Sequence, residues 1–156
     1  MQRISTCLWY DSDAHEAAEF YCSVVPDSEI LEVAHYGDAG PGEAGKVLLA
    51  RVRLAGTEYT LLNGGPIYKL SPAVSITLAC EDQEEIDHFW AVLSEGGAES
   101  QCGWLTDRFG LSWQVVPAAM GEILGDPDPA RAERAMRAML GMRRLDIAAM
   151  LAAKDG

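Results

Sequence analysis

One pattern of residues occurs twice in this chain of 156 residues. A shift of 69 positions places Asp13 on Asp82, Glu16 on Glu85 and the aromatic pair Phe20-Tyr21 on Phe89-Trp90. In both copies an apolar, β-prone run comes first, followed by an acidic helix start and a helix with one apolar face. A sheet with a single helix buries too little surface to be stable alone, so the repeat predicts two similar modules in one fold.

Each copy predicts one strand, one helix and three further strands. A turn is expected at 107–110, where Asp and Gly lie between two short apolar runs. The remaining boundaries follow from apolar alternation, from helical spacing and from the positions of Gly and Pro. The predicted strands are 4–10, 29–36, 46–54, 57–63, 74–80, 99–102, 104–106 and 112–116, and the predicted helices begin at Asp13 and at Asp82.

These elements predict an α+β fold. Two βαβββ modules are expected to form a curved mixed sheet around a cavity, with a C-terminal helical extension. The predicted domain covers 1–117, with modules 1–66 and 67–117, and the helical tail covers 118–156. In the tail, Asp128 and Pro129 predict a helix start, and two Met-rich apolar stripes predict short amphipathic helices. We expect this tail to contribute to a homodimer.

Charge and cysteine content limit the partners and the compartment. The formal net charge is −12 at pH 7, which disfavours nucleic acid because phosphates bind positive surfaces. No apolar run approaches the ~20 residues that a membrane helix needs, and no export signal is evident. The four cysteines form no CxxC pair. We therefore expect a cytoplasmic protein that binds neither nucleic acid nor membrane.

Four stretches carry a resemblance to a known family. They are LWYDSDAHEAAEFYCSVVPDSEI at 8–30, LLNGGP at 61–66, ACEDQEEIDHFW at 79–90 and GWLTDRFGLSWQVVP at 103–117. Together they resemble the PhnB-like branch of the vicinal-oxygen-chelate superfamily, which includes glyoxalases and bleomycin-resistance proteins. Members of this branch often carry the label 3-demethylubiquinone-9 3-methyltransferase. The residues do not support that activity, because no Gly-rich strand-to-helix turn typical of S-adenosylmethionine sites is found.

The resemblance implies a cavity that holds a divalent metal in the superfamily's enzymes. Its ligand positions correspond here to Thr6 or its neighbour Ser5, and to Asn63, Ser75 and Gln114. Hydroxyls and amides are poor substitutes for His, Glu, Asp or Cys as zinc ligands. We therefore predict no metal and no cofactor. Asn63 and Gln114 remain as neutral hydrogen-bonding groups that could orient a ligand.

Tryptophans and cysteines supply the other candidate site residues. Trp9, Trp104 and Trp113 fit a pocket for a flat or apolar ligand, although core packing explains them about as well. Cys80 and Cys102 stand near strand ends, where an inert buried thiol is expected rather than a nucleophile. The predicted ligand-binding residues are Trp9, Asn63, Ser75, Trp104, Trp113 and Gln114.

Three functions remain open from the sequence. The chain could be a metal-independent enzyme acting on a small metabolite, a ligand-sequestering protein of the bleomycin-resistance type, or a dimeric scaffold with a vestigial site. All three share the expected cavity. The predicted partners are therefore a small-molecule ligand and a second copy of the chain.

Overall fold

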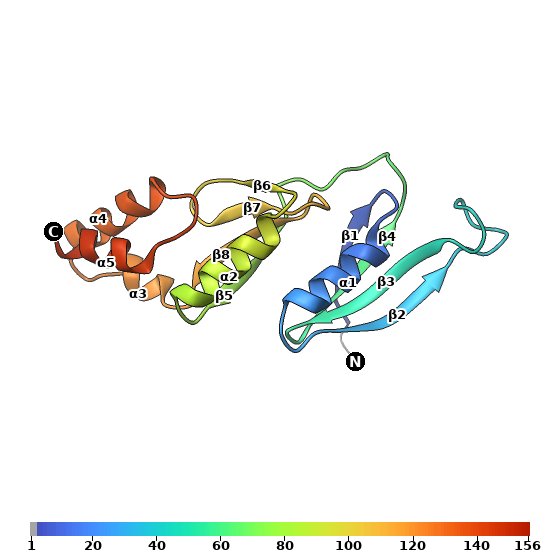
Figure 1. The fold of residues 1–156 in the computed structure, drawn as a ribbon, viewed down its shortest axis with the longest axis horizontal. Coiled ribbons are helices and arrows are strands. Elements are labelled where there is room, and N and C mark those ends of the chain that lie inside the picture. The colour runs from blue at the N-terminus through green and yellow to red at the C-terminus, as the bar shows by residue number, and fades with distance from the viewer. Residues whose placement is uncertain (1–2) are drawn as a thin grey trace. The chain divides into compact units, whose positions relative to one another are not determined.

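The computed structural model describes residues 3–156 and divides the chain into two compact units. Unit 1 ends at Leu70, and unit 2 is Ser71–Gly156. Each unit contains one four-stranded mixed sheet and one helix that packs on it, and unit 2 also contains the C-terminal helices (Figure 1).

Unit 1 has the strand order β1-β4-β3-β2. β1 and β4, the first and last strands of the unit in the sequence, pair in parallel, and the other neighbouring strands are antiparallel. Helix α1 packs against β2, β3 and β4 on one face of the sheet (Figure 1). The elements are β1 (Thr6–Tyr10), α1 (Ala14–Val24), β2 (Glu29–His35), β3 (Val47–Leu54) and β4 (Thr57–Asn63).

Unit 2 repeats this topology with the order β5-β8-β7-β6. Its first and last strands in the sequence, β5 and β8, also pair in parallel. The elements are β5 (Ser75–Cys80), α2 (Gln83–Ser94), β6 (Ala98–Glu99), β7 (Trp104–Thr106) and β8 (Ser112–Pro117). The predicted α+β class and the two βαβββ modules are therefore confirmed.

The tail forms three helices rather than two. They are α3 (Met120–Leu124), α4 (Pro129–Leu140) and α5 (Ile147–Asp155). Ile123, Ala135, Leu145 and Met150 form their buried core. Asp128 caps α4 by accepting a hydrogen bond from the backbone N–H of Ala130, as its sequence position predicts.

Backbone and side-chain contacts attach this tail to the rest of unit 2. The N–H groups of Cys102 and Gly103 donate to the carbonyls of Met142 and Arg143, each at 2.8 Å. The Gln83 amide donates to the Leu145 carbonyl and accepts from the N–H of Ile147, each at 2.9 Å. The C-terminal helices therefore pack on their own chain.

The segment 99–102 differs from its prediction. The strand β6 ends at Glu99, and the following residues form a turn. Cys102 has φ +57° and Gly103 has φ +84°, values outside the extended region that a strand needs. Contact with the tail holds this turn, and apolar patterning within the segment cannot predict a contact made some 40 residues away.

The two modules start their helices in different ways. Asp82 caps α2, because its carboxylate accepts from the N–H of Glu85 at 2.9 Å, as predicted. The Asp13 side chain makes no such bond. Instead the N–H of Ala14 donates to Asn63 Oδ1 at 2.8 Å, so a residue at the end of β4 caps α1.

No helix among residues 3–156 is long and apolar enough to cross a lipid bilayer.

Candidate functional site

Two cavities adjoin in unit 1, on either side of Tyr36. The apolar cavity has a volume of about 300 Å³ and the polar cavity about 580 Å³. Both are lined by Tyr36, Pro41 and Gly64. The Tyr36 hydroxyl donates to the Asn63 carbonyl at 2.6 Å. This bond holds the Tyr36 ring in place where the two cavities meet.

The apolar cavity is walled by the Trp9 ring, with Leu48, Leu62 and Tyr36. The indole N–H donates to the Gly65 carbonyl at 2.9 Å, so the polar atom of the side chain is satisfied inside the protein. A Cβ at Gly64 would lie 2.2 Å from the ring. Only glycine permits this approach, and the ring is therefore held against the backbone.

A β-bulge in β3 turns side chains toward these cavities. Ala34 pairs with Leu49 and His35 with Val47, so Leu48 is an extra residue between two paired ones. A bulge of this kind interrupts the alternation of side chains along a strand. Leu48 consequently lines the apolar cavity, and Val47 lines the polar one.

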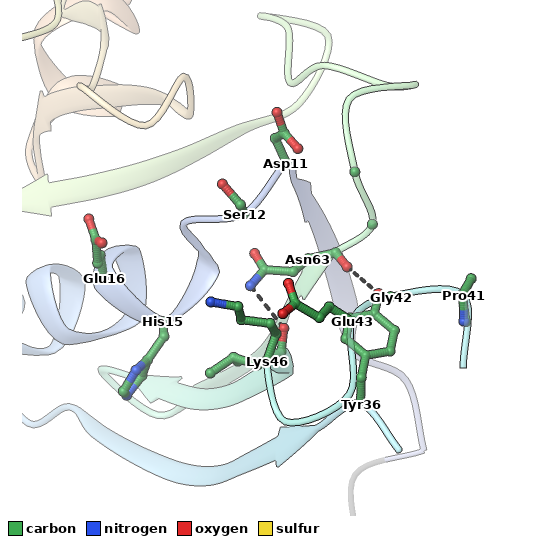
Figure 2. Close-up of a pocket in the computed structure, with 13 residues that line it drawn as sticks. Asp11, Ser12, His15, Glu16, Tyr36, Pro41, Gly42, Glu43, Lys46 and Asn63 are labelled. Carbon is green, nitrogen blue, oxygen red and sulfur yellow. Dashed lines mark hydrogen bonds between the residues drawn. The ribbon is translucent and has the colours of Figure 1, made fainter. Parts of the chain in front are cut away.

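The polar cavity lies between the start of α1 and the loop that joins β2 to β3 (Figure 2). Asp11, His15 and Glu16 come from the α1 side, and Glu43 and Lys46 from the loop side. The loop packs on Tyr36, since a Cβ at Gly42 would lie 2.4 Å from the ring. The cavity thus presents charged and hydrogen-bonding side chains from both sides.

Asn63 lines the polar cavity, but its amide already has partners at both ends. Oδ1 accepts from the N–H of Ala14, and Nδ2 donates to the Val47 carbonyl at 3.1 Å (Figure 2). The residue is only 8% exposed. Asn63 therefore ties together α1, β3 and β4.

Three of the predicted ligand-binding residues lie on one face of the unit 2 sheet. Gln114 Nε2 donates to Ser75 Oγ at 3.0 Å, and Gln114 pairs directly with Trp104 on the neighbouring strand. All three are partly exposed. Because directly paired residues point to the same side, the open face of unit 2, opposite α2, presents an amide, a hydroxyl and an indole together.

Trp113 lies on the other side of that sheet. It is completely buried, and its indole N–H donates to Asp107 Oδ2 at 2.8 Å. Oδ1 of Asp107 accepts from the N–H groups of Phe109 and Leu111. These contacts confirm the predicted turn at 107–110. They also support a role for Trp113 in core packing rather than in a ligand pocket.

Alternation along β1 places Thr6 and Ser5, the residues at the first position where the resemblance implies a metal ligand. Leu8 and Tyr10 are buried and alternate with the more exposed Trp9, so Thr6 shares their side and its neighbour Ser5 the opposite one. Among residues 3–156, no group of three or more His, Cys, Asp or Glu is arranged to hold a metal ion. On the open face of unit 2 the polar groups at these positions are the Ser75 hydroxyl and the Gln114 amide.

The cysteines are free, and Cys80 is buried. Burial raises the pKa of the Cys80 thiol to about 11, and the nearby carboxylates of Glu85 and Asp82 add to the increase. Burial likewise raises the pKa of Cys7. These thiols stay protonated at neutral pH, which disfavours nucleophilic attack.

Sequence reasoning missed several cavity residues. Tyr36, Lys46 and Leu48 belong to the facing ends of the strands predicted at 29–36 and 46–54, and none of them was predicted to line a cavity. Alternation within the strand predicted at 57–63 offered one signal: Leu61 and Asn63 share one side, so Leu62 faces the other. The bulge at Leu48 left no comparable signal.

Comparison with known proteins identifies the family. The model of the 3-demethylubiquinone-9 3-methyltransferase family matches residues 2–116. The chain is 34% identical to a solved PhnB protein from Bacillus cereus whose description carries the same methyltransferase name, with a TM-score of 0.69. The match covers 75% of this chain and all of that one. No curated protein matches the chain.

Two more distant structures share the fold alone. Protein PA1353 from Pseudomonas aeruginosa is 23% identical, with a TM-score of 0.60 over 72% of this chain and 95% of that one. The fosfomycin resistance protein FosX from Listeria monocytogenes is 12% identical, with a TM-score of 0.52 over 80% of this chain and 96% of that one. The predicted resemblance to the PhnB-like branch and its methyltransferase label is confirmed.

Proposed function

The chain belongs to the 3-demethylubiquinone-9 3-methyltransferase family, and from this membership and the cavities of unit 1 we propose that it binds a small organic molecule. The proposed ligand places an apolar part against the Trp9 ring. The observation that carries the proposal is the apolar cavity, whose tryptophan wall has its only polar atom already bonded within the protein.

The apolar cavity suits a ring or a short branched chain. Its volume of about 300 Å³ lies at the lower end of the range for small-molecule sites, which are usually lined by apolar and aromatic side chains. Tyr68 also contacts Trp9 edge to face, with 5.0 Å between the ring centroids. Aromatic walls of this kind bury large apolar areas.

For unit 2 we propose that Ser75, Trp104 and Gln114 contact a ligand on the open sheet face. Gln114 uses one N–H on Ser75, and its amide oxygen accepts no hydrogen bond from residues 3–156. An amide offers a donor and an acceptor without a fixed charge. These groups fit a hydroxyl or carbonyl of a ligand.

The methyltransferase name is not part of this proposal. Helix α1 follows Asp11-Ser12-Asp13, and α2 follows Glu81-Asp82. The Gly-rich loop at 37–45 joins two strands. These strand-to-helix turns differ from the glycine-rich turn that usually holds S-adenosylmethionine. The proposed ligand could be converted by the protein as an enzyme or held by it without reaction. The competing function is a dimeric scaffold that binds no ligand.

We further propose a homodimer in a reducing cytoplasm. Exposed apolar side chains on the tail support self-association, among them Met136, Leu140 and Leu151. Four free cysteines, one of them exposed, support a reducing compartment. Sedimentation at several concentrations tests the oligomeric state.

Ligand-induced stabilisation tests the binding proposal. A compound that binds only the folded state raises stability by RT ln(1 + [L]/Kd), so a metabolite library is screened by thermal unfolding. A hit should lose most of its effect on the Trp9→Leu protein and keep it on the Gln101→Ala protein, which changes an exposed residue of unit 2. A turnover assay on the hits separates an enzyme from a sequestering protein. If no compound stabilises the protein, or if every hit stabilises the Trp9→Leu protein as strongly as the parent, the proposal is wrong.

A further inference from the structure

The loop 37–45 between β2 and β3 forms one wall of both cavities in unit 1. Its residues at the apolar cavity are Gly37, Gly40 and Pro41, and those at the polar cavity are Pro41, Gly42 and Glu43. Pro41 therefore lies where the two cavities meet, on the same loop as Gly42 and Glu43 (Figure 2). The other walls belong to strands, to α1 or to residues close to them. A displacement of this loop would thus open both cavities to solvent.

Backbone hydrogen bonds hold the loop at its base. The N–H of Tyr36 donates to the Lys46 carbonyl at 2.8 Å, and the N–H of Gly45 donates to the Tyr36 carbonyl at 2.9 Å. Two further backbone bonds stay within 37–46. Among residues 3–156, no backbone hydrogen bond joins 37–44 to α1, β1 or β4. The loop is therefore tied to the sheet at its two ends.

One contact holds the middle of the loop against the site. Every residue of 37–45 is exposed except Gly42, which is partly buried. A Cβ at Gly42 would have three atoms of the Tyr36 ring within 2.6 Å, so this glycine lies over the face of the ring. A Cβ at Gly40 would lie 2.9 Å from the edge of the ring, and one at Gly37 would meet no atom within 4 Å. The loop thus rests on Tyr36 mainly through Gly42.

This kind of attachment favours opening of the loop as a unit. Segments with few buried contacts open at a low free-energy cost, and lifting Gly42 from the ring breaks none of the bonds at the base. Gly45 has φ +86°, a conformation that glycine adopts more readily than other residues. It lies at the base, where the chain must turn back toward β3. Loops that close over ligand sites pivot on a few terminal residues of this kind.

From these features we infer that 37–44 is a lid over the ligand site of unit 1, with Tyr36, Gly45 and Lys46 as its hinge. In the closed state, which the structure describes, Gly42 rests on the Tyr36 ring and Pro41 walls both cavities. In the open state this wall is displaced and the apolar cavity faces solvent. The inference rests on the proposed function and adds the route by which the ligand enters and leaves.

Alanine substitutions at three loop glycines test the lid in a graded way. Gly37, Gly40 and Gly42 have no positive φ, so alanine strains none of them, and each change restricts the chain in the same way. Gly42→Ala should prevent closure because its Cβ overlaps the ring, Gly40→Ala should weaken closure, and Gly37→Ala should leave it intact. An open state that is a minor species, at about 10% or less, should thereby become dominant in Gly42→Ala, an increase of about tenfold or more.

NMR of the full-length protein without a ligand measures the open fraction. A proton over the face of an aromatic ring resonates upfield, so an α-proton of Gly42 should be shifted upfield in the parent. The amides of 38–44 should show exchange on the μs–ms timescale of lid opening, and those of β2 and β3 should not. In Gly42→Ala the upfield shift and the exchange should disappear, and the loop should become disordered on the ps–ns timescale.

Several outcomes would overturn the lid. A parent without exchange in 38–44 would show a static loop, and exchange that spreads along β2 and β3 would show fraying of the hairpin. A loop as ordered in Gly42→Ala as in Gly37→Ala would also refute closure by this contact. The library screen is independent of these measurements. A moving lid without any stabilising compound refutes the proposed function alone, and a static loop with a bound compound refutes the lid alone.

Discussion

Replacing Asn63 by Ala tests whether this residue holds the fold or only contacts a ligand. The change removes the bond from the N–H of Ala14 and the bond to the Val47 carbonyl. Each buried hydrogen bond contributes about 0.5–1.5 kcal/mol, and loss of a helix cap costs about 0.5–2 kcal/mol. We expect the free energy of unfolding to fall by about 2–3 kcal/mol.

Thermal and urea unfolding measure this loss. A loss of that size lowers Tm by about 4–12 °C for a chain of this length. Asn63→Asp should be less harmful at α1, because its carboxylate can still accept from Ala14 and suits a helix N-terminus. Gln101→Ala, at an exposed position, serves as the neutral control. An Asn63→Ala protein as stable as the parent but defective in ligand binding would refute the structural role.

Three further predictions follow from the contacts of unit 2. Gln83→Ala should destabilise the protein by about 1–3 kcal/mol, because it removes both bonds that Gln83 makes to the tail; equal stability in urea would contradict this. Cys80, whose pKa is raised to about 11 by burial, should resist thiol reagents in the folded protein up to pH 9. Rapid labelling at that pH would contradict the burial of this thiol. Gln114→Leu should weaken a ligand bound at the open face by about 0.5–1.5 kcal/mol, whereas Gln101→Leu should not.

The order of elements could be predicted from the sequence because it depends on local signals. The Asp82 cap, the turn at Asp107 and the alternating runs each lie within a few residues of what they determine. The two first strands begin at Thr6 and Ser75, and the two helices at Ala14 and Gln83. The repeat in the sequence is therefore a repeat in the structure.

The site was harder to predict because its contacts are distant in the sequence. Asn63 caps a helix that begins 49 residues earlier, and the same position had been interpreted as a ligand contact. The bulge at Leu48 breaks the alternation on which face assignments rest. The short helix α3 and the turn at Cys102 depend on packing in and against the tail.

The central claim is that a small molecule binds against Trp9 in unit 1. Fluorine NMR of protein labelled with 5-fluorotryptophan reports separately on all four tryptophans, once each signal has been assigned by substitution with Phe. On titration with the tightest-binding compound of the screen, the Trp9 signal should shift saturably, while the signals of the buried Trp90 and Trp113 stay in place. A saturable shift at Trp90 or Trp113 with Trp9 unmoved would contradict the claim.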